Sequence, residues 1–245
     1  MNVQEQFLNA CRDGNLVLAQ QLFKNNPTID ISDDNELNFQ YACYNGHLEV
    51  AQWLLEVEPD INISANNEYS FQLACENGHL ELAQWLLTVK PTINISALNE
   101  CAFHFACKNG HLQLAQWLLQ VKPDIDISAL HEDAFRLSCS KEHLQIAQWL
   151  LTVKPTINIS ASNEYAFKMA CEEEHLEVAQ WLQTLKPFKY YIKIENNKIM
   201  YWKIYTNYKY LLIFVSKSGV NLFLYPLFVK LYNINNNFSL QSGII

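Results

Sequence analysis

Hydrophobic and polar positions repeat along this chain with a period of 32 residues. In the copy at residues 64–95, apolar side chains recur at i, i+3 and i+4 in two short stretches. This spacing puts them on one face of a helix and predicts a first helix over 68–75 and a second over 79–89. Neither helix can bury its apolar face alone, so neighbouring copies must complete the core. The pattern therefore predicts an all-α solenoid of stacked helix pairs.

The array is expected to hold six copies, ending near residue 187. The first copy has Gln21 where later copies have Trp, and the last has Gln183 where others have Leu, as suits terminal repeats that face water. Glu142 and Glu174 replace a turn glycine, and each costs on the order of 1 kcal/mol if the position needs positive φ. The predicted boundaries lie near 1–31, 32–63, 64–95, 96–127, 128–159 and 160–187, followed by a non-repeat tail at 188–245.

Residues 46–55, with the sequence GHLEVAQWLL, and residues 59–62, with PDIN, resemble the ankyrin repeat. The period is one residue shorter than the 33 usual in that family. The resemblance implies a non-enzymatic scaffold that binds a protein partner through its concave face and turn tips. The wording of the copies, with Asn-Glu before the first helix and Ala-Gln-Trp-Leu-Leu in the second, is similar to ankyrin proteins of amoeba-infecting giant DNA viruses. Two alternatives stay open: a substrate-recruiting adaptor of a ubiquitin ligase, and an unselected degenerate member of a duplicated viral family.

Glutamates recur in register at the predicted start of each first helix. One interpretation is a carboxylate that favours the helix N-terminus, beside asparagine caps such as Asn67. The other is a solvent-facing acidic stripe that attracts a basic partner. Other first-helix and turn positions differ between copies and are expected at the interface. The candidate partner-binding residues are Glu36, Glu68, Tyr69, Glu76, Asn77, Glu100, Lys108, Glu132, Asp133, Lys141, Glu164 and Tyr165.

Three further ladders of identical residues have structural explanations. Cysteines one period apart, such as Cys43 and Cys75, are too distant for a disulfide if repeats stack roughly 9–10 Å apart. We expect them buried and reduced, in an intracellular protein. The tryptophans are expected in the core. The resemblance implies that histidines such as His79 bond backbone at the inter-helix turn.

The formal net charge is -8, and the acidic residues concentrate in the repeats. An acidic array argues against nucleic-acid binding, which depends on neutralising phosphates, and leaves a basic protein partner open. We expect no cofactor, metal or catalytic residue, and a monomer. The N-terminus lacks the pattern of a signal peptide, so secretion is not expected. No apolar stretch reaches the roughly 18 residues of a spanning helix, although a membrane-associated tail stays an alternative.

The tail from residue 188 is dominated by Phe, Tyr, Ile, Asn and Lys. Its composition favours an unselected or poorly packed extension. The competing interpretation is a β-hairpin, formed by residues 190–194 and 199–205, that covers the last repeat.

Overall fold

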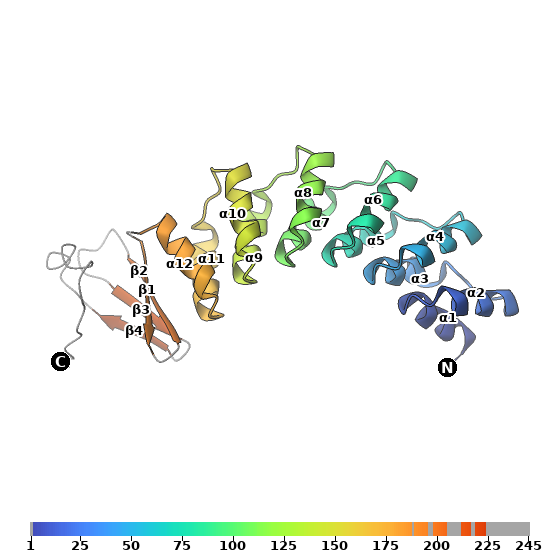
Figure 1. The fold of residues 1–245 in the computed structure, drawn as a ribbon, viewed down its shortest axis with the longest axis horizontal. Helices are drawn as coiled ribbons and strands as arrows, with labels where there is room; N and C mark the ends of the chain where they lie inside the picture. Colours follow the sequence, from blue (N-terminus) through green and yellow to red (C-terminus); the bar gives the residue numbers. More distant parts are fainter. Residues whose placement is uncertain (1, 188, 196–197, 205–211, 217–218, 224–245) are drawn as a thin grey trace. The chain divides into compact units, whose positions relative to one another are not determined.

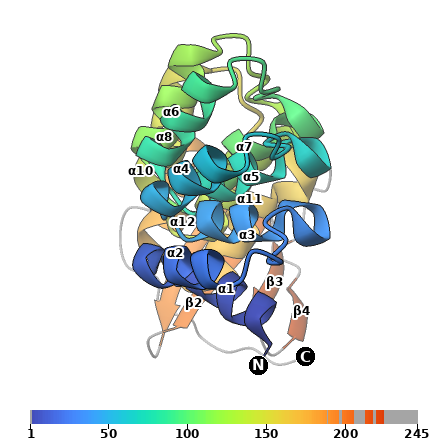
Figure 2. The same ribbon diagram turned by 90° about the vertical axis from the view of Figure 1, so that its right-hand side faces the viewer.

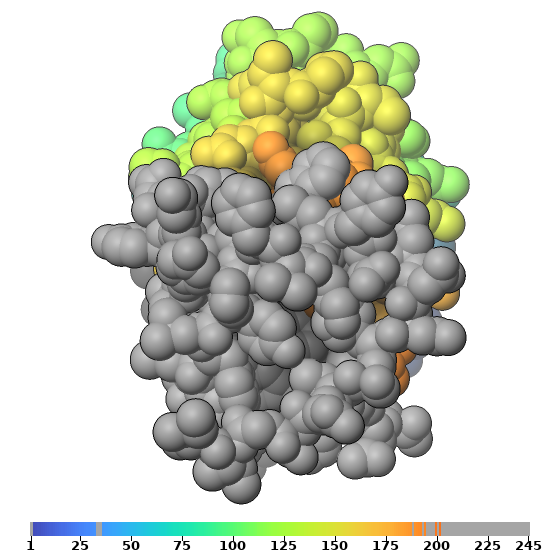
Figure 3. Space-filling model, turned by 90° about the vertical axis from the view of Figure 1, so that its left-hand side faces the viewer, coloured from blue at the N-terminus to red at the C-terminus, as the bar shows by residue number. Residues whose placement is uncertain are grey.

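The computed structural model describes the chain except residues 1, 188, 196–197, 205–211, 217–218 and 224–245, which are grey in Figure 1. In the space-filling view of Figure 3, the coloured surface belongs to described residues. The described part contains twelve helices: α1 Val3–Arg12, α2 Leu16–Asn25, α3 Asp33–Tyr44, α4 Leu48–Val57, α5 Ala65–Glu76, α6 Leu80–Val89, α7 Ala97–Lys108, α8 Leu112–Val121, α9 Ala129–Ser140, α10 Leu144–Val153, α11 Ala161–Glu172 and α12 Leu176–Leu185.

The chain divides into two compact units, Met1–Ala166 and Phe167–Ile245, with the boundary inside α11. In the first unit, α1, α3, α5, α7 and α9 pack side by side in sequence order, and each contacts the second helix that follows it. Figure 2 places the second helices α2 to α10 on one side of this unit and the first helices on the other. The predicted stack of helix pairs is confirmed.

Each first helix of the first unit contributes a fully buried phenylalanine to the core. From Phe7 to Phe103, each phenylalanine ring packs on a tryptophan from the second helix of the next repeat. The ring centroids lie 6.1 Å apart for Phe7–Trp53, 6.5 Å for Phe39–Trp85, 6.5 Å for Phe71–Trp117 and 6.3 Å for Phe103–Trp149. The tryptophans therefore join neighbouring repeats, but they are half-buried and not in the buried core that the sequence predicts.

A left-handed turn opens the first helices α5, α7, α9 and α11, which the sequence did not lead us to expect. In α5, Asn66, Asn67 and Glu68 have φ of 54°, 60° and 68°, so the right-handed helix begins at Tyr69. The turn recurs at the equivalent residues of α7, α9 and α11. Asparagine tolerates this conformation better than most non-glycine residues. The prediction that Asn67 caps the helix is wrong, because Asn67 lies within the left-handed turn, one residue before Glu68, and not at the N-cap position.

The second unit contains the end of α11, α12 and an antiparallel sheet in the order β1-β2-β3-β4. Its strands are β1 Tyr190–Glu195, β2 Lys198–Ile204, β3 Leu212–Ser216 and β4 Gly219–Phe223. β1 and β2 form a hairpin in which Tyr190 pairs with Lys203, and β1 packs against α12. The hairpin interpretation of the tail is therefore confirmed over the strands β1 and β2.

Two tyrosines of this hairpin pack on the last repeat. Tyr190 is fully buried and stacks on Phe167 with centroids 4.0 Å apart and planes 6° apart. Tyr201 meets the same ring edge-on at 5.8 Å, and its hydroxyl donates to Glu172 Oε1 at 3.0 Å. The prediction of a poorly packed tail is wrong for these residues, because their rings complete the core beside Phe167. The remainder of the tail, including 224–245, lies outside the described residues.

Candidate partner-binding surface

One side of each first helix points away from the second helix of the same repeat. We call this side the first-helix face. In α5, Phe71, Ala74 and Cys75 are buried on the opposite side, so the face carries Tyr69, Leu73 and Glu76. Their equivalents vary between repeats, whereas the buried phenylalanine is constant. In the first unit the face consists of Leu37, Tyr41, Tyr44, Tyr69, Leu73, Glu76, Cys101, Phe105, Lys108, Asp133, Leu137, Ser140 and Tyr165.

Aromatic and aliphatic side chains reach solvent on this face and at the adjoining turns. Tyr44 is 45% exposed and Tyr69 42% exposed. At the tips of the left-handed turns, Leu98 is 55% and Leu130 49% exposed. Tyr44 and both leucines belong to the varied first-helix and turn positions that the sequence predicts at the interface.

The glutamate ladder is buried, so the expectation of a solvent-facing stripe is wrong. The five side chains are 6–9% exposed. The Oε1 atom of four of them accepts the backbone N–H 26 residues later: Asn62 to Glu36 at 3.0 Å, Asn94 to Glu68 at 3.3 Å, Asp126 to Glu100 at 3.4 Å and Asn158 to Glu132 at 3.1 Å. In two repeats Oε2 also accepts a serine hydroxyl, from Ser64 at 2.5 Å and from Ser128 at 2.6 Å.

The reason for this burial is the left-handed turn. Because the glutamate ends that turn with positive φ, its side chain is directed to the loop that leads into the next repeat. Each carboxylate thus connects two successive turns of the array. The fifth member, Glu164, has the same φ and burial.

Glu76 and Asn77 have different roles, one on the surface and one in holding the fold. The amide of Asn77 donates to Leu73 O at 3.0 Å, at the end of its own helix. The backbone carbonyl of Glu76 accepts from Asn109 Nδ2 at 2.7 Å and from His111 Nε2 at 3.0 Å, and its side chain is half-buried on the first-helix face. Asn77 is therefore committed to the fold, while the carboxylate of Glu76 remains part of the surface.

The remaining candidates lie toward the later repeats of the first unit. Lys108 lies over the ring of Phe105, with Nζ 5.4 Å from the centroid. Lys141 is exposed at the C-cap of α9. These two cations share the C-terminal ends of α7 and α9, so they are presented at the same edge of the face.

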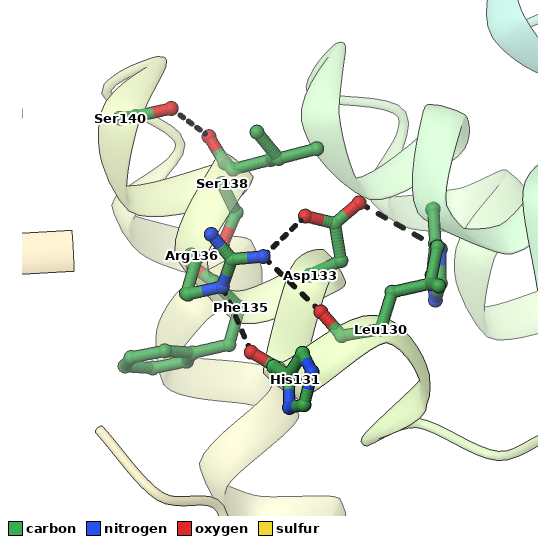
Figure 4. Close-up of polar contacts among 9 residues, drawn as sticks. Leu130, His131, Asp133, Phe135, Arg136, Ser138 and Ser140 are labelled. Carbon is green, nitrogen blue, oxygen red and sulfur yellow. Dashed lines mark hydrogen bonds and ion pairs between the residues drawn. The ribbon is translucent and has the colours of Figure 1, made fainter. Parts of the chain in front are cut away.

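Asp133 and Tyr165 are brought together by Arg136, which the sequence interpretation missed. The Nη2 atom of Arg136 donates to Asp133 Oδ1 at 2.8 Å, and its guanidinium carbon lies 5.0 Å from the ring centroid of Tyr165. Arg136 also donates to the carbonyls of Leu130 and His131, which holds the left-handed turn of α9 (Figure 4). Gln72 performs the same role in α5 through Asn67 O at 2.7 Å.

His104 borders this cluster and is buried. Its Nδ1 atom lies 3.9 Å from Asp133 Oδ2. Burial lowers the pKa of His104, although Asp133, Glu100 and Asp126 oppose that shift. The imidazole is therefore neutral at pH 7, and its approach to Asp133 is not an ion pair at that pH.

The histidine ladder bonds backbone, as the resemblance implied, but it does so across repeats. His47, His79 and His111 donate from Nε2 to the carbonyl oxygens of Arg12, Tyr44 and Glu76 at 3.0, 2.9 and 3.0 Å. Each acceptor lies 35 residues earlier, at the end of the preceding first helix. These bonds fasten neighbouring inter-helix turns.

The cysteines are free and, except for half-buried Cys101, buried as predicted. Among the described residues, no group of three or more His, Cys, Asp or Glu side chains could hold a metal ion. No described helix is both long and apolar enough to cross a membrane.

A family model for ankyrin repeats, comprising three copies, matches residues 39–131 and 103–190. Together these matches span more than half of the chain. No curated protein matches it.

Proposed function

The chain belongs to the ankyrin-repeat family, and from this premise we propose that it binds a protein partner through the first-helix face and the turn tips. The observation that carries the proposal is the contrast between constant core and varied surface. Phe71 has an identical, buried equivalent in each neighbouring repeat. Tyr69, two residues away, is exposed, and Leu37, Cys101 and Asp133 take its place in three other repeats, although Tyr165 matches it. Stacking of the repeats constrains the position of Phe71, whereas the position of Tyr69 is free to vary for partner recognition.

The exposed side chains suit protein recognition. Tyr44 and Tyr69 offer large contact areas at low cost in conformational entropy, and tyrosine is enriched at binding hot spots. Leu98 and Leu130 add apolar area at the tips of the turns. The glutamate ladder is left out of this interface, because its carboxylate oxygens accept hydrogen bonds within the array.

Narrower proposals rest on the family assignment or on the repeated sequence phrase alone. The same surface would serve a substrate-recruiting adaptor of a ubiquitin ligase. The repeated Ala-Gln-Trp-Leu-Leu phrase supports an origin from a giant DNA virus, in which the chain could also be an unselected, degenerate copy. We further propose that the protein is a non-enzymatic monomer that acts inside the cell.

Affinity capture with the full chain tests the proposed function. Wild type is compared with Tyr44→Ala/Tyr69→Ala and with Gln52→Ala/Gln84→Ala, a control pair exposed on the second helices. We expect the control to retain captured proteins that the tyrosine pair loses by more than about tenfold, since hot-spot losses exceed 1 kcal/mol. Equal capture by both variants would place the partner elsewhere.

A further inference from the structure

The chain contains its own example of a cation bound on the first-helix face. The guanidinium of Arg136, in α9, covers the ring of Tyr165 in α11. It also pairs with Asp133, which lies in α9 beside it. Such an arrangement combines a cation–π contact with a carboxylate that neutralises the charge. It shows what a tyrosine at this position of the repeat accepts.

Tyr69 occupies the same position three periods earlier, and its ring lacks this cation. Gln40 stands where Arg136 stands, and Leu37 where Asp133 stands. Among the described residues, the cations that lie over aromatic rings are Lys108 and Arg136, and neither covers Tyr69. The ring of Tyr69 is correspondingly exposed, whereas Tyr165 is half-buried.

A carboxylate accompanies Tyr69 on the same helix. Glu76 follows it by seven residues, two turns along α5 on the same face. The separation along the axis is about 10 Å at 1.5 Å per residue. An extended segment in the polyproline II conformation rises about 3.1 Å per residue with three residues per turn, so side chains three residues apart lie on one face about 9 Å apart. Two basic side chains three residues apart in a partner would therefore reach Tyr69 and Glu76 together.

The charge of the first unit has the sign that attracts such a segment. Residues 1–166 carry 20 Asp and Glu against eight Lys and Arg, a formal net charge of -12 with histidines neutral. A field of this sign raises the association rate of a cationic segment, and the effect weakens as salt is added.

We propose that Tyr69 and Glu76 form a site for a basic, extended segment of a partner protein, with an arginine on the Tyr69 ring and an Arg or Lys three residues away on Glu76. This inference rests on the proposed function and names the chemistry of its partner. The partner's guanidinium takes at Tyr69 the place that Arg136 takes at Tyr165.

Selection from a displayed library of random peptides, with the full chain as bait, tests the site. We expect enriched peptides to carry two basic residues spaced i, i+3. Their affinity should fall about fivefold in Tyr69→Leu, the size of an exposed to partly desolvated cation–π contact, and stay unchanged in Tyr69→Phe. Glu76→Gln should weaken binding and reduce its salt dependence. Gln84→Ala is the control, expected to bind as wild type, because Gln84 is exposed on the second helix α6 and lies outside the first-helix face.

The outcomes separate this inference from the proposed function. Peptides without basic residues that still require Tyr44 or Tyr69 would overturn the basic-segment site and leave the first-helix face as the interface. Basic peptides that bind equally to Tyr69→Leu would also overturn it. If no peptide is enriched above an empty support, both the site and the proposed function lose their basis. Thermal unfolding of each variant checks that the exposed substitutions leave the fold intact.

Discussion

Gly78 lies directly beneath the imidazole of His111, on the next repeat. A Cβ at position 78 would come within 2.5 Å of His111 Nδ1, and Gly78 has φ of +78°. The same imidazole donates from Nε2 to Glu76 O at 3.0 Å. The glycine therefore meets two requirements of the Gly-His-Leu phrase: a left-handed backbone and room for the histidine that fastens the next turn.

Gly78→Ala should destabilise the protein by about 2–3 kcal/mol. The left-handed conformation costs an alanine about 1–2 kcal/mol, and displacement of His111 loses a hydrogen bond of about 1 kcal/mol. Glu142→Gly is the converse variant, because Glu142 is exposed and already has φ of 65°. It should stabilise the protein by about 1 kcal/mol. Urea unfolding measures both, and a neutral Gly78→Ala would contradict the close approach to His111.

Glu68→Ala should cost about 1–3 kcal/mol, because it leaves the Asn94 N–H and the Ser64 hydroxyl without their acceptor. Glu68→Gln keeps one acceptor oxygen and should cost less than Glu68→Ala. Glu81→Ala, on the exposed surface of α6, is the control and should change stability by less than about 0.5 kcal/mol. Equal stability of Glu68→Ala and the control would mean that the ladder is a surface feature.

The period predicted the helix pairs and the burial of Phe71, because stacking repeats the same apolar demand in every copy, whereas Trp85 is only half-buried. The period could not predict where Glu68 points. A sequence shows that Asn67 tolerates positive φ, but three consecutive left-handed residues follow from how the turn meets the next repeat. Arg136 was missed for a related reason: its partners Leu130 and Tyr165 come together only once two repeats are stacked.

Stability should decline as the pH falls below about 6.5, the ordinary histidine pKa. Burial lowers the pKa of His104 and of His79, so the unfolded chain binds protons that the folded chain resists. The neutral forms therefore contribute stability above that pH, which is lost as acid protonates the folded state. His104→Gln, with the residue type of positions 40 and 72, should flatten the decline. Unfolding free energies measured from about pH 8 to about pH 5 should separate the two proteins; parallel profiles would count against this role.

Cys101 should be the first thiol to react in the native protein. It is half-buried, and burial, Glu76 and Asp133 raise its thiol pKa. The other six cysteines are buried, and burial raises the pKa of Cys11 to about 12 and those of the remaining five further still. Reaction requires the thiolate and access to it, so these should wait for unfolding. Mass spectrometry after timed alkylation identifies the labelled residue, and early labelling of Cys75 would refute the burial of the ladder.

Tyr190→Ala should destabilise the second unit by about 3–5 kcal/mol, as for other large aromatic truncations in a core. In the first unit, the first-helix phenylalanines from Phe7 to Phe103 each pack on a tryptophan of the following repeat. Phe167 has no seventh repeat to follow it, and the rings of Tyr190 and Tyr201 pack on it instead. Ile194→Ala is the matched control, because Ile194 lies in the same strand and is 50% exposed. Hydrogen exchange of α12 should accelerate in Tyr190→Ala and not in the control, since a terminal repeat without its cap opens more readily. Unchanged exchange in both variants would mean that the hairpin does not stabilise the last repeat. That result would favour the interpretation of the tail as an unselected extension.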